Sequence, residues 1–166
     1  TLYYHRQRQL EVRSRTHYRP FFYPLDAIGN WNRGYGTRGF YQYQFVVPFD
    51  DSQDAVRDVL GRLARAGAGS FLAVLKTFGD VPSPGMMSFP RPGVTLALDL
   101  PNRGPDTVRL LHGCDAIVRE AGGAVYPAKD ACMTPNSFRA YFPQWEDFSA
   151  FIDPAFSSSF WRRVTA

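Results

Sequence analysis

The sequence predicts an α+β fold of the ferredoxin-like type: a β-α-β-β-α-β unit whose antiparallel sheet carries its helices on one face, followed by a helical C-terminal tail. Three observations predict it. Stretches in which side chains alternate with a period of two residues are interleaved with two stretches of helical periodicity. Clusters of Gly and Pro separate these stretches. The 166 residues, 45% hydrophobic and 20% charged, suffice for one domain with a substantial core.

The first predicted strand covers residues 38–48, RGFYQYQFVVP, in which β-forming residues alternate between two faces. Gln42 and Gln44 share one of these faces. Asp50, Asp51 and Ser52 then offer an N-cap for a helix that Gly67 and Gly69 close. The apolar stripe of this helix consists of Ala55, Val56, Val59, Leu60, Leu63 and Ala64.

The remaining elements are predicted from the same signals. In order, they are a strand at 70–78, a loop rich in Pro and Gly at 79–92, a strand at 94–100, a helix from Gly104-Pro105 to Gly122-Gly123, and a short strand at 124–127. The inward positions of this second helix are Val108, Leu111, Cys114, Ile117 and Val118. In the tail, Thr134 and Pro135 form an N-cap and first-turn pair.

Residues 1–20 are expected to be a basic lead-in, and residues 21–166 the domain itself. The lead-in holds His5, Arg6, Arg8, Arg13, Arg15, His17 and Arg19 against one acid, Glu11. Such a patch could attract phosphate. Because no nucleic-acid motif accompanies the charge, a solvated surface or a contact with another domain is the favoured interpretation, and no nucleic-acid partner is expected.

Several classes of protein lack support. The sequence has no GxGxxG, GxxxxGK[ST], HExxH or GxSxG motif, and its three histidines are not at metal-ligand spacing, so no metal site is expected. No apolar run reaches the roughly 20 residues that span a bilayer, and no signal peptide is recognisable. Cys114 and Cys132 form no disulfide framework. A cytoplasmic, reduced protein is expected.

Two kinds of polar residue interrupt apolar stretches. Only two of the 19 Lys and Arg residues are lysines, Lys76 in AVLKTF and Lys129 in VYPAKD. Each could place a compact charge beside a pocket, or simply extend over apolar surface into water. Gln42 and Gln44 need hydrogen-bond partners if they are buried. They converge with Lys76 and Thr95 only if the strand register puts all four on one face.

Several long sequence words, in order, resemble one family. FFYPLDAIGNWNRGYGTRGFYQYQFVVP, FLAVLKTFG, MMSFPRPGVTLALDLP and EAGGAVYPAKDACMT resemble the C-terminal half of FAD-linked oxidases of the vanillyl-alcohol-oxidase type. The resemblance runs from Phe21 to the ending Trp161-Arg162-Arg163-Val164. It implies an N-terminal FAD-binding domain that is absent from this chain and is its main partner. FAD would then be held mainly by that domain and be missing from this part alone.

The resemblance also implies roles for individual residues. Lys129 would lie beside the pyrimidine side of the flavin and stabilise its reduced form, and Tyr126 would line the same site and donate a hydrogen bond. The expected substrate-facing residues are Gln42, Gln44, Lys76, Phe78, Thr95 and Ala97. Thr95 and Ala97 stand where the family word often has Asn and Cys, which leaves the exact sugar open.

The leading hypothesis is therefore an FAD-dependent oxidoreductase that oxidises a secondary alcohol of a sugar or sugar-phosphate-like substrate by hydride transfer. The fragment by itself is expected to be inactive, and its flavin-side face is expected to promote self-association. The alternative is a stand-alone ferredoxin-like module that binds a ligand or regulates a partner without catalysis.

Overall fold

The computed structural model describes residues 15–166, and these form two units that are considered separately, one ending at Gly36 and one spanning Thr37–Ala166. The first unit contains helix α2 (Tyr18–Phe22) and the 3-10 helices η1 (Pro24–Ala27) and η2 (Trp31–Tyr35). His5, Arg6, Arg8, Glu11 and Arg13 of the predicted lead-in lie outside the described residues.

The second unit is built on a four-stranded sheet in the order β2-β3-β1-β4, and every neighbouring pair is antiparallel. Its elements are β1 (Phe40–Val47), α3 (Ser52–Arg65), β2 (Ala73–Phe78), β3 (Gly93–Pro101), α4 (Pro105–Glu120) and β4 (Ala124–Val125). This is the predicted β-α-β-β-α-β order, so the α+β, ferredoxin-like prediction is confirmed.

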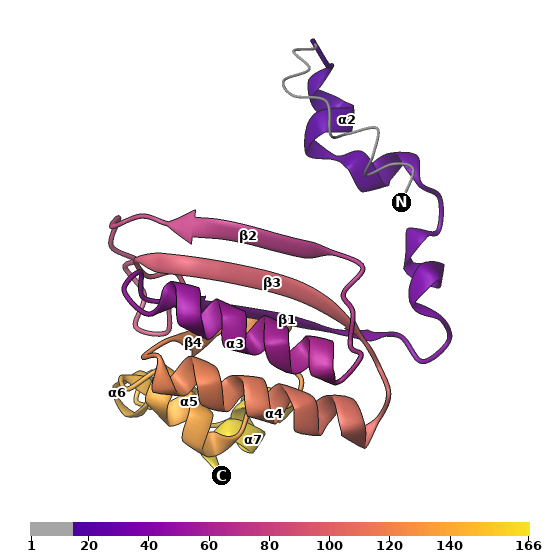
Figure 1. The fold of residues 1–166 in the computed structure, drawn as a ribbon. Coiled ribbons are helices and arrows are strands. Elements are labelled where there is room, and N and C mark those ends of the chain that lie inside the picture. The colour runs from indigo at the N-terminus through magenta and orange to yellow at the C-terminus, as the bar shows by residue number, and fades with distance from the viewer. Residues whose placement is uncertain (1–14) are drawn as a thin grey trace. The chain divides into compact units, whose positions relative to one another are not determined.

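Helices α3 and α4 pack side by side against one face of this sheet (Figure 1). The periodic apolar residues of both helices turn toward the strands, as their spacing predicts. Fully or almost fully buried core side chains include Phe45, Val47, Val59, Leu63, Leu96, Leu98, Leu100, Leu111, Cys114 and Val118. Cys114 is a free thiol in this core, as predicted. Leu60 and Ala64 depart from the prediction, because both remain exposed, Leu60 to 44%.

Three strands are shorter than their sequence predicts. The first spans Phe40–Val47 rather than residues 38–48. The second strand begins at Ala73 rather than at Ser70. The Asp99 amide is shared there between the Leu72 carbonyl at 3.2 Å and the Ser70 hydroxyl at 2.9 Å, and that hydroxyl donates to the Leu72 carbonyl at 2.6 Å. The Ser70 side chain therefore competes with regular pairing before β2. The last strand ends at Val125, because Pro127 opens the 3-10 helix η3 (Pro127–Lys129).

The C-terminal tail is helical, as predicted, and consists of α5 (Pro135–Tyr141), α6 (Trp145–Ser149) and α7 (Ser159–Thr165). Thr134 caps α5 by accepting from the Ser137 amide, with Pro135 in the first turn. Helix α5 contacts α4 and β4, and α7 packs on α5. Within residues 15–166, no helix combines the length and apolar character needed to cross a membrane.

Candidate functional site

The strand register decides which predicted site residues share a face. Lys76 of β2 pairs with Thr95 of β3, and Gln44 of β1 pairs with Ala97 of β3. Since directly paired residues point to the same side of a sheet, these four side chains lie together. We call this side, opposite α3 and α4, the open face. The strand residues on it are Gln42, Gln44, Val46, Val74, Lys76, Phe78, Thr95, Ala97 and Asp99.

Both glutamine amides on the open face are held by hydrogen bonds to β3. The Gln42 amide nitrogen donates to the Asp99 carboxylate at 3.1 Å, and the Gln44 amide nitrogen donates to the Thr95 hydroxyl at 3.1 Å. Gln44, Thr95 and Asp99 are buried, whereas Gln42 is exposed. With each nitrogen engaged in this way, the amide oxygens are left as the acceptors for a further partner.

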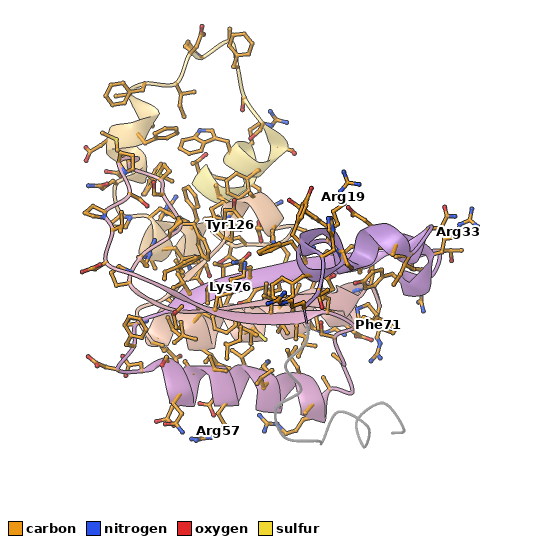
Figure 2. All side chains as sticks on the ribbon, turned by 90° about the horizontal axis from the view of Figure 1, so that it is seen from above. Arg19, Arg33, Arg57, Phe71, Lys76 and Tyr126 are labelled. Atoms are coloured by element: carbon orange, nitrogen blue, oxygen red, sulfur yellow. The ribbon has the colours of Figure 1, made fainter. Side chains whose placement is uncertain are left out.

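A row of aromatic rings lies beside these amides. The backbone amide of Tyr126, just beyond β4, donates to the carbonyl of Gln44 at 2.8 Å, which places Tyr126 next to that residue. Its ring stacks on that of Phe89 with centroids 4.7 Å apart, and Phe89 meets Phe78 edge to face at 5.9 Å. Figure 2 shows Lys76 and Tyr126 on the same side of the strands, away from α3. The open face thus combines polar groups with an aromatic row.

The loop before β3, which carries Phe89, is held by Arg91. The Arg91 guanidinium donates to the carbonyl of Tyr141 at 3.1 Å and lies 5.7 Å from the centroid of the Phe142 ring. Its Nε also contacts the Phe89 carbonyl at 3.4 Å. Burial lowers the pKa of Arg91 from its ordinary value. These contacts join the loop to the end of α5, so they hold Phe89 of the aromatic row in place.

Lys129 lies outside the strands, at the end of η3, three residues after Tyr126. Its backbone amide donates to the Tyr126 carbonyl at 3.1 Å, and its side chain is half-buried. The turn therefore fixes the start of the Lys129 side chain close to the aromatic row. Lys76, by contrast, is exposed on β2, an edge strand of the sheet.

The structure brings together most of the predicted residues: Gln42, Gln44, Lys76, Phe78, Thr95, Ala97 and Tyr126. Sequence reasoning missed Asp99, Phe89 and Arg91 as members of the same site. Asp99 could have been found, because it follows Thr95 and Ala97 at the same two-residue period. Phe89 and Arg91 lie in a loop rich in Pro and Gly, where no periodicity predicts the direction of a side chain.

The two thiols do not offer a nucleophile. Burial raises the pKa of Cys114 and that of Cys132 to about 12, so both are protonated near neutral pH. The chemistry that the open face can perform is binding: two amide oxygens accept hydrogen bonds, a lysine supplies positive charge, and aromatic rings supply an apolar wall.

The fold and this face define the chain as an α+β domain with a polar and aromatic site on the side of its sheet opposite α3 and α4. A comparison with protein-family models finds no match. Over 149 residues, however, the chain is 37% identical to decaprenylphosphoryl-beta-D-ribose oxidase of Mycolicibacterium smegmatis, which covers 87% of this chain and 32% of that protein. The resemblance to an oxidase that the sequence words indicate is therefore confirmed.

A second relative is an uncharacterised protein of the mprA 5′ region of Streptomyces coelicolor. It is 38% identical over 145 residues, which cover 84% of this chain and 38% of that protein. The chain thus spans about a third of the length of both curated relatives.

Proposed function

We propose that this chain forms the substrate-side part of a flavin-dependent oxidoreductase that oxidises a secondary alcohol of a sugar-like substrate. The observation that carries the proposal is the open face. There, Gln42 and Gln44 have their amide nitrogens bound to β3 and their oxygens left to accept, beside the Phe78–Phe89–Tyr126 row. Substrate hydroxyl groups can donate to such a pair of acceptors.

The substrate class follows from the groups on this face. Two neighbouring amide oxygens suit two hydroxyls of a sugar or polyol, and the exposed ammonium of Lys76 suits a phosphate or another anionic substituent. The aromatic row supplies the apolar surface on which a sugar ring packs. The relative from Mycolicibacterium smegmatis is named for a substrate with both features, a ribose that carries a phosphoryl group.

The same face fits one side of a flavin ring system. Such a ring has an apolar edge and a polar pyrimidine edge, and the open face offers the aromatic row of Tyr126 and polar side chains within one patch. The chain has no glycine-rich phosphate motif, so we assign the rest of FAD to a separate N-terminal part of the native protein. When bound, the flavin supplies acceptance of the hydride from the alcohol carbon.

In this proposal, the residues of the chain have separate tasks. Gln42 and Gln44 orient the substrate hydroxyls, and Lys76 binds an anionic substituent. Lys129 holds a positive charge beside the pyrimidine edge of the flavin, where it favours the negative charge that accompanies reduction. Tyr126 packs at the mouth of the site and donates a hydrogen bond. We assign the proton acceptor to the flavin-binding part, because the carboxylate of the open face, Asp99, is buried and already accepts a hydrogen bond from Gln42.

Two lysine variants of the native protein test the separate roles of Lys129 and Lys76. We expect Lys129→Ala to slow anaerobic flavin reduction by about 100-fold, the effect of losing one preorganised stabilising group, with little change in substrate affinity. Lys76→Ala serves as the matched control and should weaken binding of an anionic substrate with a smaller effect on the limiting rate. Unchanged reduction kinetics in Lys129→Ala would remove Lys129 from the mechanism.

A further inference from the structure

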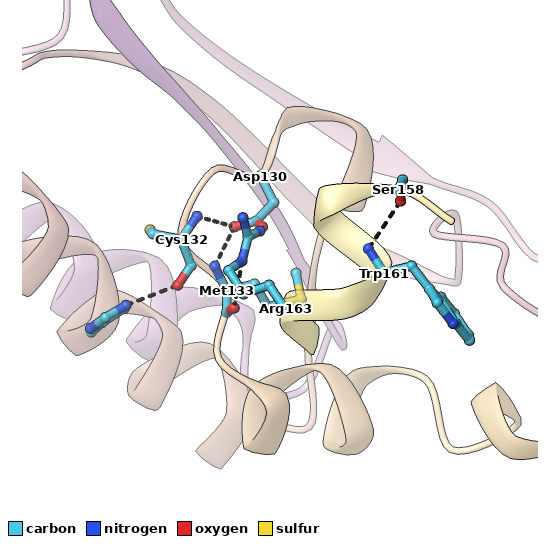
Figure 3. A network of polar contacts seen from close by, with 7 residues as sticks. Asp130, Cys132, Met133, Ser158, Trp161 and Arg163 are labelled. Atoms are coloured by element: carbon cyan, nitrogen blue, oxygen red, sulfur yellow. Dashed lines mark hydrogen bonds and ion pairs between the residues drawn. The ribbon is translucent and has the colours of Figure 1, made fainter. Parts of the chain in front are cut away.

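The turn that follows Lys129 is fixed by a buried charge. Asp130, the next residue, has a side chain that is 5% exposed. One of its carboxylate oxygens accepts from the backbone amides of Cys132 at 3.0 Å and Met133 at 2.7 Å, and the other forms an ion pair with Arg163 of α7 (Figure 3). We call this ion pair the Asp130–Arg163 latch.

Arg163 holds the same turn through a second contact, and α4 adds a third. The Nε of Arg163 donates to the carbonyl of Met133 at 3.3 Å, and its guanidinium lies 5.6 Å from the centroid of the Phe160 ring. The His112 ring nitrogen lies 2.9 Å from the carbonyl of Cys132. Side-chain contacts thus attach the four residues 130–133 to both α7 and α4.

On its other side, the Lys129 turn is attached to the sheet. The Tyr126 amide donates to the Gln44 carbonyl at 2.8 Å, and the Asp130 amide donates to the Pro127 carbonyl at 3.2 Å. Lys129 therefore lies in a short segment, Tyr126 to Asp130, that is attached at one end to β1 and at the other end to the Asp130–Arg163 latch. Its backbone is fixed, so the position of the ammonium depends on the conformation of the four-carbon side chain.

The charges near Lys129 determine the position of its ammonium. A carboxylate taken out of water needs a cation or several hydrogen bonds. Asp130 receives two backbone N–H groups and Arg163, so its oxygens are already occupied. Without Arg163, the nearest cation in sequence is the ammonium of Lys129 itself, and a salt bridge between the two would draw that ammonium away from the open face.

We propose that Arg163 is a positioning residue: by neutralising Asp130, it leaves the Lys129 ammonium free to face the flavin. This inference rests on the proposed function of Lys129. It assigns a positioning role in the reaction to α7, which follows every strand of the sheet in the sequence. Arg163 contacts neither substrate nor flavin in this account and acts only through Asp130 and Lys129.

Four variants of the native protein separate positioning from simple stabilisation. Arg163→Met removes the charge and keeps the apolar stem, and the double variant Asp130→Asn with Arg163→Met removes both charges. Arg163→Gln keeps an N–H donor without the charge and replaces the Met variant if the latter does not fold. Arg162→Met is the matched control, because Arg162 is an exposed neighbour on the same helix that donates to Ser157 instead.

Two readouts that do not measure turnover report the position of the ammonium. The first is the dissociation constant of sulfite for the oxidised flavin, which tightens when a positive charge lies beside the ring. The second is the rate at which an amine-reactive acylating reagent labels Lys129, measured by mass spectrometry of peptides against Lys76 as the internal standard. An ammonium in a salt bridge has a raised pKa and is labelled more slowly.

We expect Arg163→Met to weaken sulfite binding about tenfold and to slow Lys129 labelling about tenfold relative to Lys76, because the salt bridge to Asp130 withdraws the ammonium from both the ring and the reagent. Arg162→Met should leave both within about twofold of the native protein. The double variant should restore both most of the way, because a neutral Asn no longer attracts the ammonium. A purely structural latch predicts the opposite, a double variant that is at least as impaired as the single one.

Unchanged Lys129 labelling in a folded Arg163→Met protein overturns the inference, and so does a double variant that shows no recovery. Failure of the proposed function looks different. A native protein that carries no flavin refutes the oxidoreductase assignment, whereas the labelling ratio still decides whether Arg163 controls Lys129. If flavin is bound and Lys129→Met leaves sulfite affinity unchanged, the role of Lys129 beside the ring is refuted independently of the latch.

Discussion

Asp115, on the helix side of the sheet, should make the stability of this domain fall as pH rises through the weakly acidic range. The residue is 3% exposed. It accepts a hydrogen bond from the hydroxyl of Tyr43 at 2.9 Å, and its backbone carbonyl accepts one from the hydroxyl of Tyr141 at 2.8 Å. The informative change is Asp115→Asn, which keeps the shape and an acceptor for Tyr43 but cannot ionise.

The magnitude follows from the pKa of this carboxyl. Burial raises the pKa of Asp115 from 3.8 to about 6, against the opposing effect of the Tyr43 hydrogen bond. The folded state therefore binds the proton more tightly than the unfolded state does. The cost of the ionised carboxylate is absent below about pH 4 and complete above about pH 6. A difference of about two pKa units at 1.36 kcal/mol per unit gives roughly 3 kcal/mol.

The assay is urea unfolding of the native protein and of Asp115→Asn at several values between about pH 4 and pH 7. We expect the free energy of unfolding of the variant, minus that of the native protein, to increase by roughly 2 to 3 kcal/mol over this range. Taking the difference cancels the titration of every other group. A difference that stays flat across the range would refute the burial of an ionisable Asp115.

Two further predictions concern the sheet. Thr95→Ala removes the acceptor of the Gln44 amide and should weaken substrate binding about tenfold in a flavin-absorbance titration, whereas Thr95→Ser should not. Gly93→Ala should lower the free energy of unfolding by roughly 2 kcal/mol or more in urea titrations, because its φ is 153° and a Cβ there would lie 2.2 Å from the Val47 carbonyl oxygen. Gly69→Ala, with nothing within 4 Å of the new Cβ, should be close to neutral; equal losses in both would contradict the steric argument.

Much of the fold could be predicted because its signals are local. Alternation over 38–48 predicts β1, and the apolar period of α3 and α4 predicts the helix face of the sheet. The departures also have local causes that a pattern does not contain. The Ser70 side chain shares the Asp99 amide with the Leu72 carbonyl before β2, and Leu60 belongs to the periodic stripe yet remains exposed.

The site was predictable only in part. The residue types on the open face could be listed from the sequence, but whether Gln44, Lys76 and Thr95 meet depends on register, and a one-residue slip would reverse it. The register is set by pairing along the whole of β1 and β3, not by these residues. Contacts between distant segments, such as Arg91 with Tyr141 and Asp130 with Arg163, leave no trace in periodicity at all.

The central claim is that the open face serves a flavin that oxidises a sugar-like alcohol. The measurement that tests it most directly is the visible absorbance of the native protein under anaerobic conditions, followed after mixing with sugars, polyols and phosphorylated pentoses. Our account predicts a flavin band that one of these substrate classes bleaches rapidly. A native protein without a flavin band would contradict the account and favour a binding module without catalysis, and a band that none of these alcohols bleaches would contradict the proposed substrate.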